Sequence, residues 1–260
     1  MAPIIVLVSL ALLIVFFIFY KKKKKKIILP QDYKELLSHH VLFYRRLNEQ
    51  NKTRFEEKIK EFLGYVRIEG VNTTVDDLDK LLVASSAVIP IFGFPGWKYY
   101  NLNNVLLYPE TFNREEFLAS GYEKNTLGMV GNGAMQRMMI LSKPALHYGF
   151  ENETGKENTG IHEFVHLLDK EDGDVDGLPE VLLNRKYSVP WLETANKNIE
   201  AIISGYSDMN IYGATNKAEF FAVASEYFFN SPYLFKENHP ELYELMTKIF
   251  NQDPGKNSSF

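Results

Sequence analysis

The sequence of 260 residues contains no cysteine. This absence excludes disulfide bonds, zinc sites built from thiolates and a cysteine nucleophile. Any zinc ion held by this chain must therefore use histidine and carboxylate ligands, which are typical of catalytic rather than structural sites. The composition is otherwise that of a globular protein, with 45% hydrophobic and 14% aromatic residues, enough for a sizeable core.

Positive charge is scarce outside one short run of the chain. Of the 29 lysines and arginines, six form the segment Lys21–Lys26. The rest of the chain then carries 23 basic against 33 acidic side chains, a formal charge of −10. An acidic body of this kind argues against nucleic-acid binding.

The first 20 residues carry no charged side chain, and residues 3–20 are almost wholly apolar. About 18 to 20 such residues are enough to cross a bilayer core as a helix. A cleaved signal peptide would have its positive charge before the apolar run and a small-residue cleavage site after it, and this sequence has neither. We therefore expect residues 1–26 to be a transmembrane anchor with a polylysine flank, and the positive-inside rule then predicts a cytoplasmic body.

Residues 27–260 form the second predicted unit, which is mostly helical with a small sheet. The spacing of apolar residues predicts helices over residues 31–64, 75–89, 191–203, 217–229 and 240–250. Short buried strands are expected over residues 105–108 and 137–141. We place the second strand at the edge of the sheet, beside the helix described next.

Residues 160–169 contain the pattern H-E-x-x-H, from His162 to His166. Residues four apart lie on the same face of a helix, so both imidazoles can reach one metal ion, with Glu163 beside them. Asn158 or Thr159 can cap the start of this helix.

An apolar stripe at helical spacing supports the same helix. Ile161, Phe164, Val165 and Leu168 would face the core, opposite the histidines, and Gly173 can end the helix. The helix therefore has a buried face and a separate face for a metal ion.

A further ligand is expected from the apolar helix over residues 217–229. It contains two carboxylates, Glu219 and Glu226, which lie seven residues apart on one face. A carboxylate on a buried helix is costly unless it is paired or bound to metal, so either residue is eligible as the third ligand. Two histidines, one glutamate and a water would complete an open zinc site. Glu163 would then accept a proton from the water, a chemistry that suits hydrolysis of a peptide bond.

Other polar residues near these helices have more than one interpretation. Tyr206 and Tyr212 are both candidates for stabilising an oxyanion, and spacing does not choose between them. Asp169, three residues after His166, either orients a ligand imidazole or has a solvent-exposed or helix-end role. His147 is expected to be a surface histidine in a loop.

The acidic loop after the H-E-x-x-H helix begins like a calcium-binding loop. Asp172, Asp174, Asp176 and Gly177 match the start of such a loop, but Leu183 stands where a bidentate glutamate is required. An acidic turn, in which the aspartates bind local backbone groups, is the preferred interpretation.

Several longer stretches accompany these residues. His162–Asp169 is followed by Asp172-Gly173 and by Asp176-Gly177-Leu178-Pro179, and a second stretch runs from Tyr212 to Phe229. Weaker echoes lie at residues 89–93, 105–109 and 251–254. In these stretches the sequence resembles the MtfA-like zinc-dependent peptidases, over most of residues 31–254.

The resemblance implies a zincin-like α+β domain that holds one Zn²⁺ ion through His162, His166 and Glu219, with Glu163 as the general base. It thus selects Glu219 over Glu226, which becomes an orienting or structural carboxylate. The spacing of Tyr212 and Glu219 is also similar to that in the catalytic domain of anthrax lethal factor, which favours Tyr212 as the oxyanion donor.

The resemblance also implies an aminopeptidase-like activity on short substrates. The founding member of the family is linked to a transcriptional repressor of sugar uptake, but the soluble members lack an anchor, so the repressor is not transferred to this chain. The first expectation is a membrane-anchored zinc metallopeptidase acting on peptide or protein substrates. The alternative is a regulatory binding protein on a zincin scaffold, with little or no turnover and an unidentified protein partner. A zinc hydrolase of non-peptide amides or esters would share every site residue.

Overall fold

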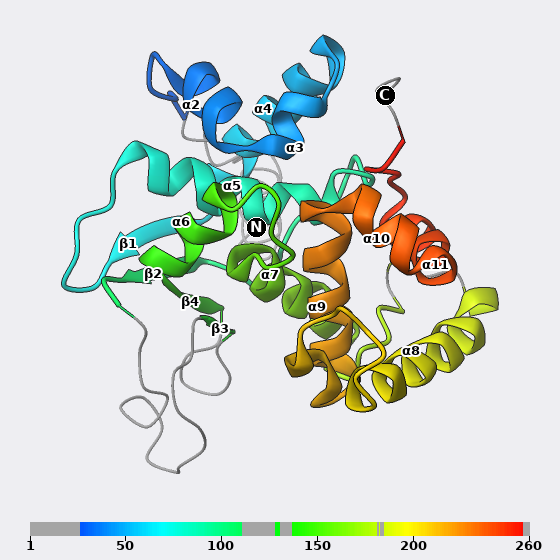
Figure 1. Cartoon of the computed structure of the whole chain (residues 1–260). Coiled ribbons are helices and arrows are strands. Elements are labelled where there is room, and N and C mark those ends of the chain that lie inside the picture. The colour runs from blue at the N-terminus through cyan, green and yellow to red at the C-terminus, as the bar shows by residue number, and fades with distance from the viewer. Residues whose placement is uncertain (1–26, 111–127, 131–136, 181, 183–184, 257–260) are drawn as a thin grey trace, which may run out of the picture.

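The computed structural model describes residues 27–110, 128–130, 137–180, 182 and 185–256 (Figure 1). The predicted transmembrane segment and its lysine run lie outside these residues. Within the part of the chain that is described, no helix combines the length and the apolar character needed to cross a membrane.

Helices make up most of the described chain, as the apolar spacing predicts. In the first half of the chain they are α2 (Tyr33–His40), α3 (Leu42–Arg46), α4 (Glu49–Leu63) and α5 (Asp77–Ile91). In the second half they are α6 (Lys143–Glu151), α7 (Thr159–Asp169), α8 (Ser188–Ile203), α9 (Lys217–Asn230), α10 (Pro232–Asn238) and α11 (Pro240–Phe250). Three short 3₁₀ helices complete the set: η3 (Lys170–Asp172), η4 (Arg185–Tyr187) and η5 (Ile211–Ala214).

A four-stranded sheet lies at one side of the helices, with the strand order β1-β2-β4-β3 (Figure 1). Its strands are β1 (Arg67–Gly70), β2 (Asn104–Tyr108), β3 (Gly128–Val130) and β4 (Met138–Ser142). β1, β2 and β4 run parallel, and β3 pairs antiparallel with β4. Strand β1 was not predicted, because it is short, polar and exposed and so lacks the alternation that marks a half-buried strand.

The position predicted for the second strand is wrong. β4 is an internal strand, because β3 covers the side on which the sheet was expected to end. The side chains of Met139, Ile140 and Leu141 are all fully buried, so the strand is covered on both faces. A short, wholly apolar run is the pattern of an internal strand, whereas an edge strand usually keeps polar residues. The loop expected around His147 is also wrong, since this residue lies in α6.

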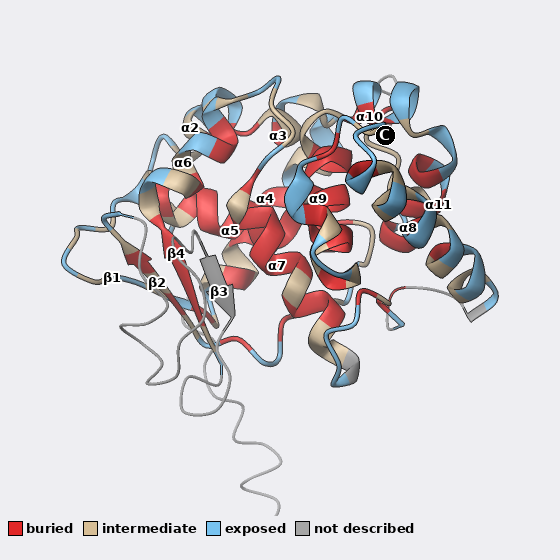
Figure 2. Cartoon of the chain, turned by 60° about the horizontal axis from the view of Figure 1, so that its bottom comes forward, coloured by how far each residue is buried: buried red, intermediate tan, exposed pale blue. Residues whose placement is uncertain are grey.

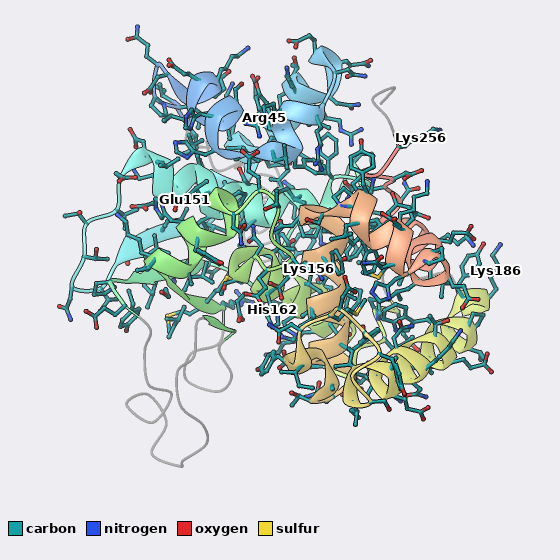
Figure 3. All side chains as sticks on the ribbon, viewed as in Figure 1. Arg45, Glu151, Lys156, His162, Lys186 and Lys256 are labelled. Carbon is teal, nitrogen blue, oxygen red and sulfur yellow. The ribbon has the colours of Figure 1, made fainter. Side chains whose placement is uncertain are left out.

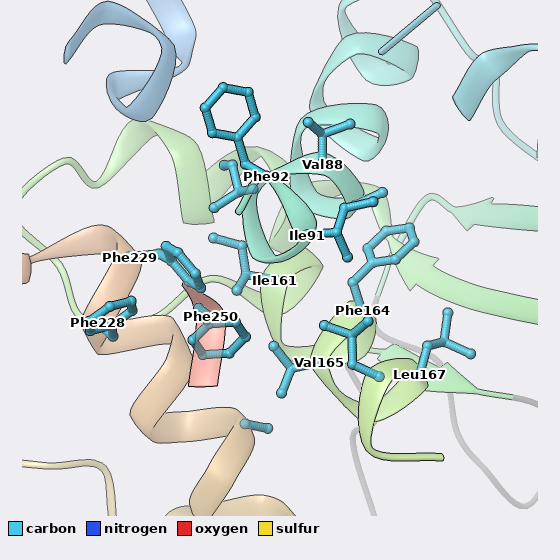
Figure 4. Packing of buried hydrophobic residues seen from close by; sticks show 14 of the residues in the cluster. Val88, Ile91, Phe92, Ile161, Phe164, Val165, Leu167, Phe228, Phe229 and Phe250 are labelled. Carbon is cyan, nitrogen blue, oxygen red and sulfur yellow. The ribbon is translucent and has the colours of Figure 1, made fainter. Parts of the chain in front are cut away.

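The hydrophobic core lies where α5, α7, α9 and α11 meet (Figures 2 and 4). Figure 4 shows Ile91 of α5 and Phe164 of α7 on one side of this core, with Phe229 of α9 and Phe250 of α11 on the other. The rings of Phe229 and Phe250 lie 4.9 Å apart in an edge-to-face arrangement. This packing holds α7 and α9, the two helices with the candidate metal ligands, side by side.

Candidate metal site

Helix α7 forms as its sequence predicts. The Asn158 side chain accepts a hydrogen bond from the Ile161 N–H at 3.0 Å, which caps the helix start. The apolar stripe of the helix is buried to within 1% exposure at Ile161, Phe164, Val165 and Leu168. With that face in the core, the Nε2 atoms of His162 and His166 meet Glu219 of α9.

Helix α9 supplies the carboxylate that meets the two histidines. The Glu219 Oε2 atom lies 3.1 Å from His162 Nε2 and 3.2 Å from His166 Nε2, and the two Nε2 atoms are 3.1 Å apart. Asn216 caps α9 by accepting the Glu219 N–H at 2.9 Å, which places Glu219 in the first turn. His162 is labelled between these two helices in Figure 3.

This triangle of donor atoms has the size that a zinc ion requires. Zinc binds histidine nitrogen and carboxylate oxygen at about 2.0–2.1 Å, so two ligand atoms of a tetrahedral site are about 3.3 Å apart. The three observed separations are within about 0.3 Å of that value. Among the described residues this is the one group of three or more potential ligands. The residues present therefore fit a single metal ion with an open fourth position.

Glu226 lies on the far side of His162 from the ligand triangle. Its Oε1 accepts a hydrogen bond from His162 Nδ1 at 2.6 Å, and its Oε2 accepts the Asn158 N–H at 2.5 Å. The first bond places the proton on Nδ1 and leaves the Nε2 lone pair free to bind a metal. The corresponding Nδ1 of His166 is buried and has no hydrogen-bond partner among the described residues. Spacing left Glu219 and Glu226 equivalent, and the structure separates their positions.

The surroundings of the site favour a positive charge at the His162 imidazole. Burial alone would lower the pKa of His162, but the carboxylates of Glu226 and Glu219 outweigh burial and raise it well above its usual range. Burial would likewise raise the pKa of Glu219, yet hydrogen bonds from the two histidines hold it well below its usual range. A metal cation can supply the same positive charge.

Glu163 has the opposite electrostatic character. It is a buried residue of α7, and burial raises its pKa above the usual range although His162 and His166 act in the other direction. A carboxylate with a raised pKa accepts a proton more readily near neutral pH, which is what a general base requires.

The two candidate tyrosines differ in position. The Tyr212 ring, in η5, lies 6.0 Å from the His162 ring, and the residue is 49% exposed. Tyr206 is 89% exposed in the loop after α8, and no ring contact joins it to the ligands within the described residues. Of the two tyrosines, Tyr212 is therefore the one that lies beside the site.

Asp169 is the last residue of α7 and is buried, so the helix-end role agrees with the structure and the solvent-exposed one is wrong. Its Oδ2 accepts the Gly177 N–H at 2.9 Å, and the Gly177 carbonyl accepts the Trp191 indole N–H at 2.6 Å. Gly177 has a φ of +76°, and a Cβ there would lie 2.3 Å from the Lys217 backbone. The acidic loop thus contacts both the last residue of α7, Asp169, and the first residue of α9, Lys217. Nearby, Asp176 accepts the Leu178 N–H at 2.9 Å, as an acidic turn predicts.

The fold and the site together define a class of protein. An H-E-x-x-H helix that faces a glutamate from a second helix, on an α+β scaffold with a mixed sheet, is the arrangement of a zincin-type metallopeptidase. The model of the glucose-regulated metallo-peptidase M90 family matches residues 18–251, and the chain belongs to this family.

Individual relatives cover much of the same length. An uncharacterized protein of Synechocystis sp. is 28% identical over 236 residues, which span 87% of this chain and 86% of the relative. The Mlc titration factor A of Cronobacter sakazakii is 26% identical over 222 residues, or 79% of this chain and 80% of the relative. The Mlc titration factor A of Serratia proteamaculans is 30% identical over 163 residues, or 58% and 61%. These relatives agree with the resemblance to MtfA-like peptidases.

Proposed function

We propose that this protein is a zinc-dependent peptidase that hydrolyses peptide bonds. The observation that carries the proposal is the convergence of His162, His166 and Glu219 on one point, with the buried Glu163 beside them. A relic of an enzyme would be expected to lose one of these groups, whereas all four are present here.

Each residue has a distinct part in the proposed reaction. His162, His166 and Glu219 hold the ion. A bound zinc ion lowers the pKa of a water to about 7 and polarises the substrate carbonyl. Glu163 accepts the proton of the attacking water and passes it to the leaving amine. The Tyr212 hydroxyl donates a hydrogen bond to the oxyanion that develops.

The substitution Glu163→Gln tests this proposal. We expect zinc content to stay that of the native protein and turnover of peptide substrates to fall by about 10²–10⁴-fold, because the general base is lost. Glu171→Gln, on the 3₁₀ helix directly after α7, is the matched control and should keep native activity. Native activity in Glu163→Gln would show that the mechanism is wrong.

The substrate class is the finer part of the proposal. We propose an aminopeptidase-like activity, as the resemblance to MtfA-like peptidases implies. Aminoacyl chromophores should be hydrolysed faster than the same compounds with a blocked amino group. Equal rates on free and blocked substrates would indicate an endopeptidase instead.

We also propose that residues 3–20 anchor the protein in a membrane with its catalytic body on the cytoplasmic side. The support is the uncharged apolar run followed by six lysines. The full chain should remain with the membrane pellet after carbonate extraction, and protease added outside intact cells should leave its body uncut. Recovery of the uncleaved chain in the soluble fraction would contradict the anchor.

A second candidate function rests on the relatives. Two of them bear the name titration factor, which favours a regulatory binding protein on the same scaffold. In that case a protein partner of this chain would bind equally well to native and Glu163→Gln protein, and zinc-loaded native protein would show no turnover. Measured turnover by the native protein would favour the peptidase.

A further inference from the structure

A second hydrogen-bonded cluster lies apart from the metal ligands and is centred on Asp208. The Asp208 Oδ2 accepts from Lys156 Nζ at 2.6 Å, from the Tyr227 hydroxyl at 2.7 Å and from Asn238 Nδ2 at 2.8 Å. Its Oδ1 accepts from His239 Nε2 at 2.6 Å. The Asp208 side chain is 32% exposed, so water alone could have satisfied much of it. Four protein donors on one loop carboxylate hold that loop in a single position.

The cluster joins two loops that lead into the two halves of the metal site. Lys156 belongs to the loop before α7, and Asp208 belongs to the loop before η5. The Lys156 Nζ also donates to the Asp208 backbone carbonyl at 2.7 Å. Next to this bond, Asn210 Nδ2 donates to Glu157 Oε1 at 2.5 Å. Two adjacent cross-links therefore connect these loops, which lie about fifty residues apart in the chain.

The second loop continues directly into the tyrosine beside the site. The Asn210 side chain accepts the Tyr212 N–H at 2.9 Å, and the Asn210 carbonyl accepts the Gly213 N–H at 3.0 Å. These two bonds start η5 and set the direction of the Tyr212 side chain, whose ring lies 6.0 Å from that of His162.

We propose that Asp208 is a positioning residue, which holds Tyr212 at the metal site by fixing the loop before η5 against the loop before α7. Asp208 bonds to Lys156, Tyr227, Asn238 and His239 and to none of the three ligands. We expect its effect on the reaction to pass through Tyr212, because its own loop continues into η5. This inference rests on the proposed peptidase function.

A double-mutant cycle separates positioning from general stability. Tyr212→Phe should lower kcat about 100-fold through loss of an oxyanion donor. Asp208→Ala should lower kcat about tenfold with KM changed less than twofold, at unchanged zinc content. In the Tyr212→Phe background, Asp208→Ala should cause no further loss. A further tenfold loss in that background would overturn the proposal.

Hydrogen exchange tests the same proposal without any turnover. Asp208→Ala should make the amides of residues 211–215 exchange about tenfold faster, while those of α7 and α9 keep their native protection. Native exchange rates over residues 211–215 would overturn the proposal even if activity fell. If native protein with full zinc shows no hydrolysis, the peptidase function fails, and this measurement still decides whether Asp208 holds the loop.

Two further variants complete the experiment. Glu241→Ala is the matched control, because Glu241 joins α11 to α8 through a 3.0 Å ion pair with Lys197 that is exposed on both sides. It should leave kcat and exchange unchanged. If Asp208→Ala does not fold, Lys156→Met removes one donor and keeps the aliphatic stem, and the same non-additivity with Tyr212→Phe is expected. Additive losses with Lys156→Met would overturn the proposal.

Discussion

At the scale of single residues, one carboxylate has two partners that both belong to the metal helix. Glu226 binds the imidazole of His162 and also the backbone N–H of Asn158, which caps α7. The Glu226 side chain therefore orients the ligand His162 and also accepts the Asn158 N–H at the start of α7, the helix to which His162 belongs. This explains how α9 tolerates a buried carboxylate among aromatic residues, since its oxygens are hydrogen-bonded.

The substitution Glu226→Gln is predicted to weaken zinc binding by about 10–100-fold, because the amide is a poorer partner for the His162 N–H than a carboxylate. Zinc affinity measured by competition with a chelator checks this. Glu200→Gln, an exposed position on α8, is the control and should bind zinc as the native protein does. Native affinity in Glu226→Gln would mean that Glu226 does not orient the ligand.

At the scale of elements, the close approach of α5 and α7 depends on a glycine. A Cβ at Gly160 would lie 2.2 Å from Ser86 Oγ and 2.9 Å from Ser86 Cβ, both on α5. Gly160 thus allows α7, the helix with the two histidine ligands, to pack closely against α5.

Gly160→Ala is predicted to destabilise the protein by about 1–3 kcal/mol, because overpacking outweighs the gain of about 1 kcal/mol that alanine offers a helix. Urea unfolding measures the change. Adding Ser86→Gly should restore part of the loss, since it removes both clashing atoms. Gly96→Ala is the control, because a Cβ there meets nothing within 4 Å. A stabilised Gly160→Ala protein would contradict the predicted clash.

A second contact between elements, around Asp79, predicts how the stability of the fold depends on pH. The fully buried Asp79 at the start of α5 bonds to Lys143 and His147 of α6, each at 2.7 Å. Burial would raise its pKa, but these partners and the Asp76 N–H lower it to about 2 from the ordinary 3.8. Because the folded pKa is depressed, the stabilisation of about 2 kcal/mol is complete above about pH 4 and is lost as pH falls toward 2.

Asp79→Asn should therefore unfold more easily than the native protein at pH 7, and the difference should shrink between pH 4 and pH 2. Urea titrations at several pH values measure it. Asp77→Asn is the control, because Asp77 forms an exposed ion pair with Lys80 and should show little effect. A difference that does not depend on pH would contradict the assigned pKa.

At the scale of the whole molecule, the residues that follow α11 bind the end of α5. The Gln252 side chain donates to the Ile89 carbonyl at 2.9 Å, and the Asn251 side chain donates to the Gly93 carbonyl at 2.9 Å. Two of the weak family echoes in the sequence are thus parts of one contact between the ends of α5 and α11.

Zinc should stabilise the whole fold, because its ligands come from two helices that unfolding separates. At a free zinc concentration of about 1,000 times Kd, the gain is about 4 kcal/mol, and the Tm should rise accordingly. Chelation should reverse the shift. The Glu219→Ala protein is the control, since its Tm should respond little to zinc. A native Tm that zinc and chelator leave unchanged would contradict the site.

Local spacing determined the H-E-x-x-H pair, its helix and its apolar stripe, and it narrowed the cap to Asn158 or Thr159. These features repeat within one or two helical turns, so the sequence alone contains them. The positions of β4 and β3, the separation of Glu219 from Glu226 and the cluster around Asp208 were decided by tertiary structure.

Each feature that tertiary structure decided depends on contacts between segments far apart in the chain, and local periodicity does not predict such contacts. Glu219 and Glu226 lie on one face of one helix and are equivalent by spacing, until packing places Glu219 at Nε2 of His162 and Glu226 at Nδ1. Asp208 lies 52 residues from Lys156 and has no motif of its own. The sequence by itself thus determined that the chain has a metal-binding H-E-x-x-H helix. The packing of α7 against α9 decided which side chains surround its two histidines.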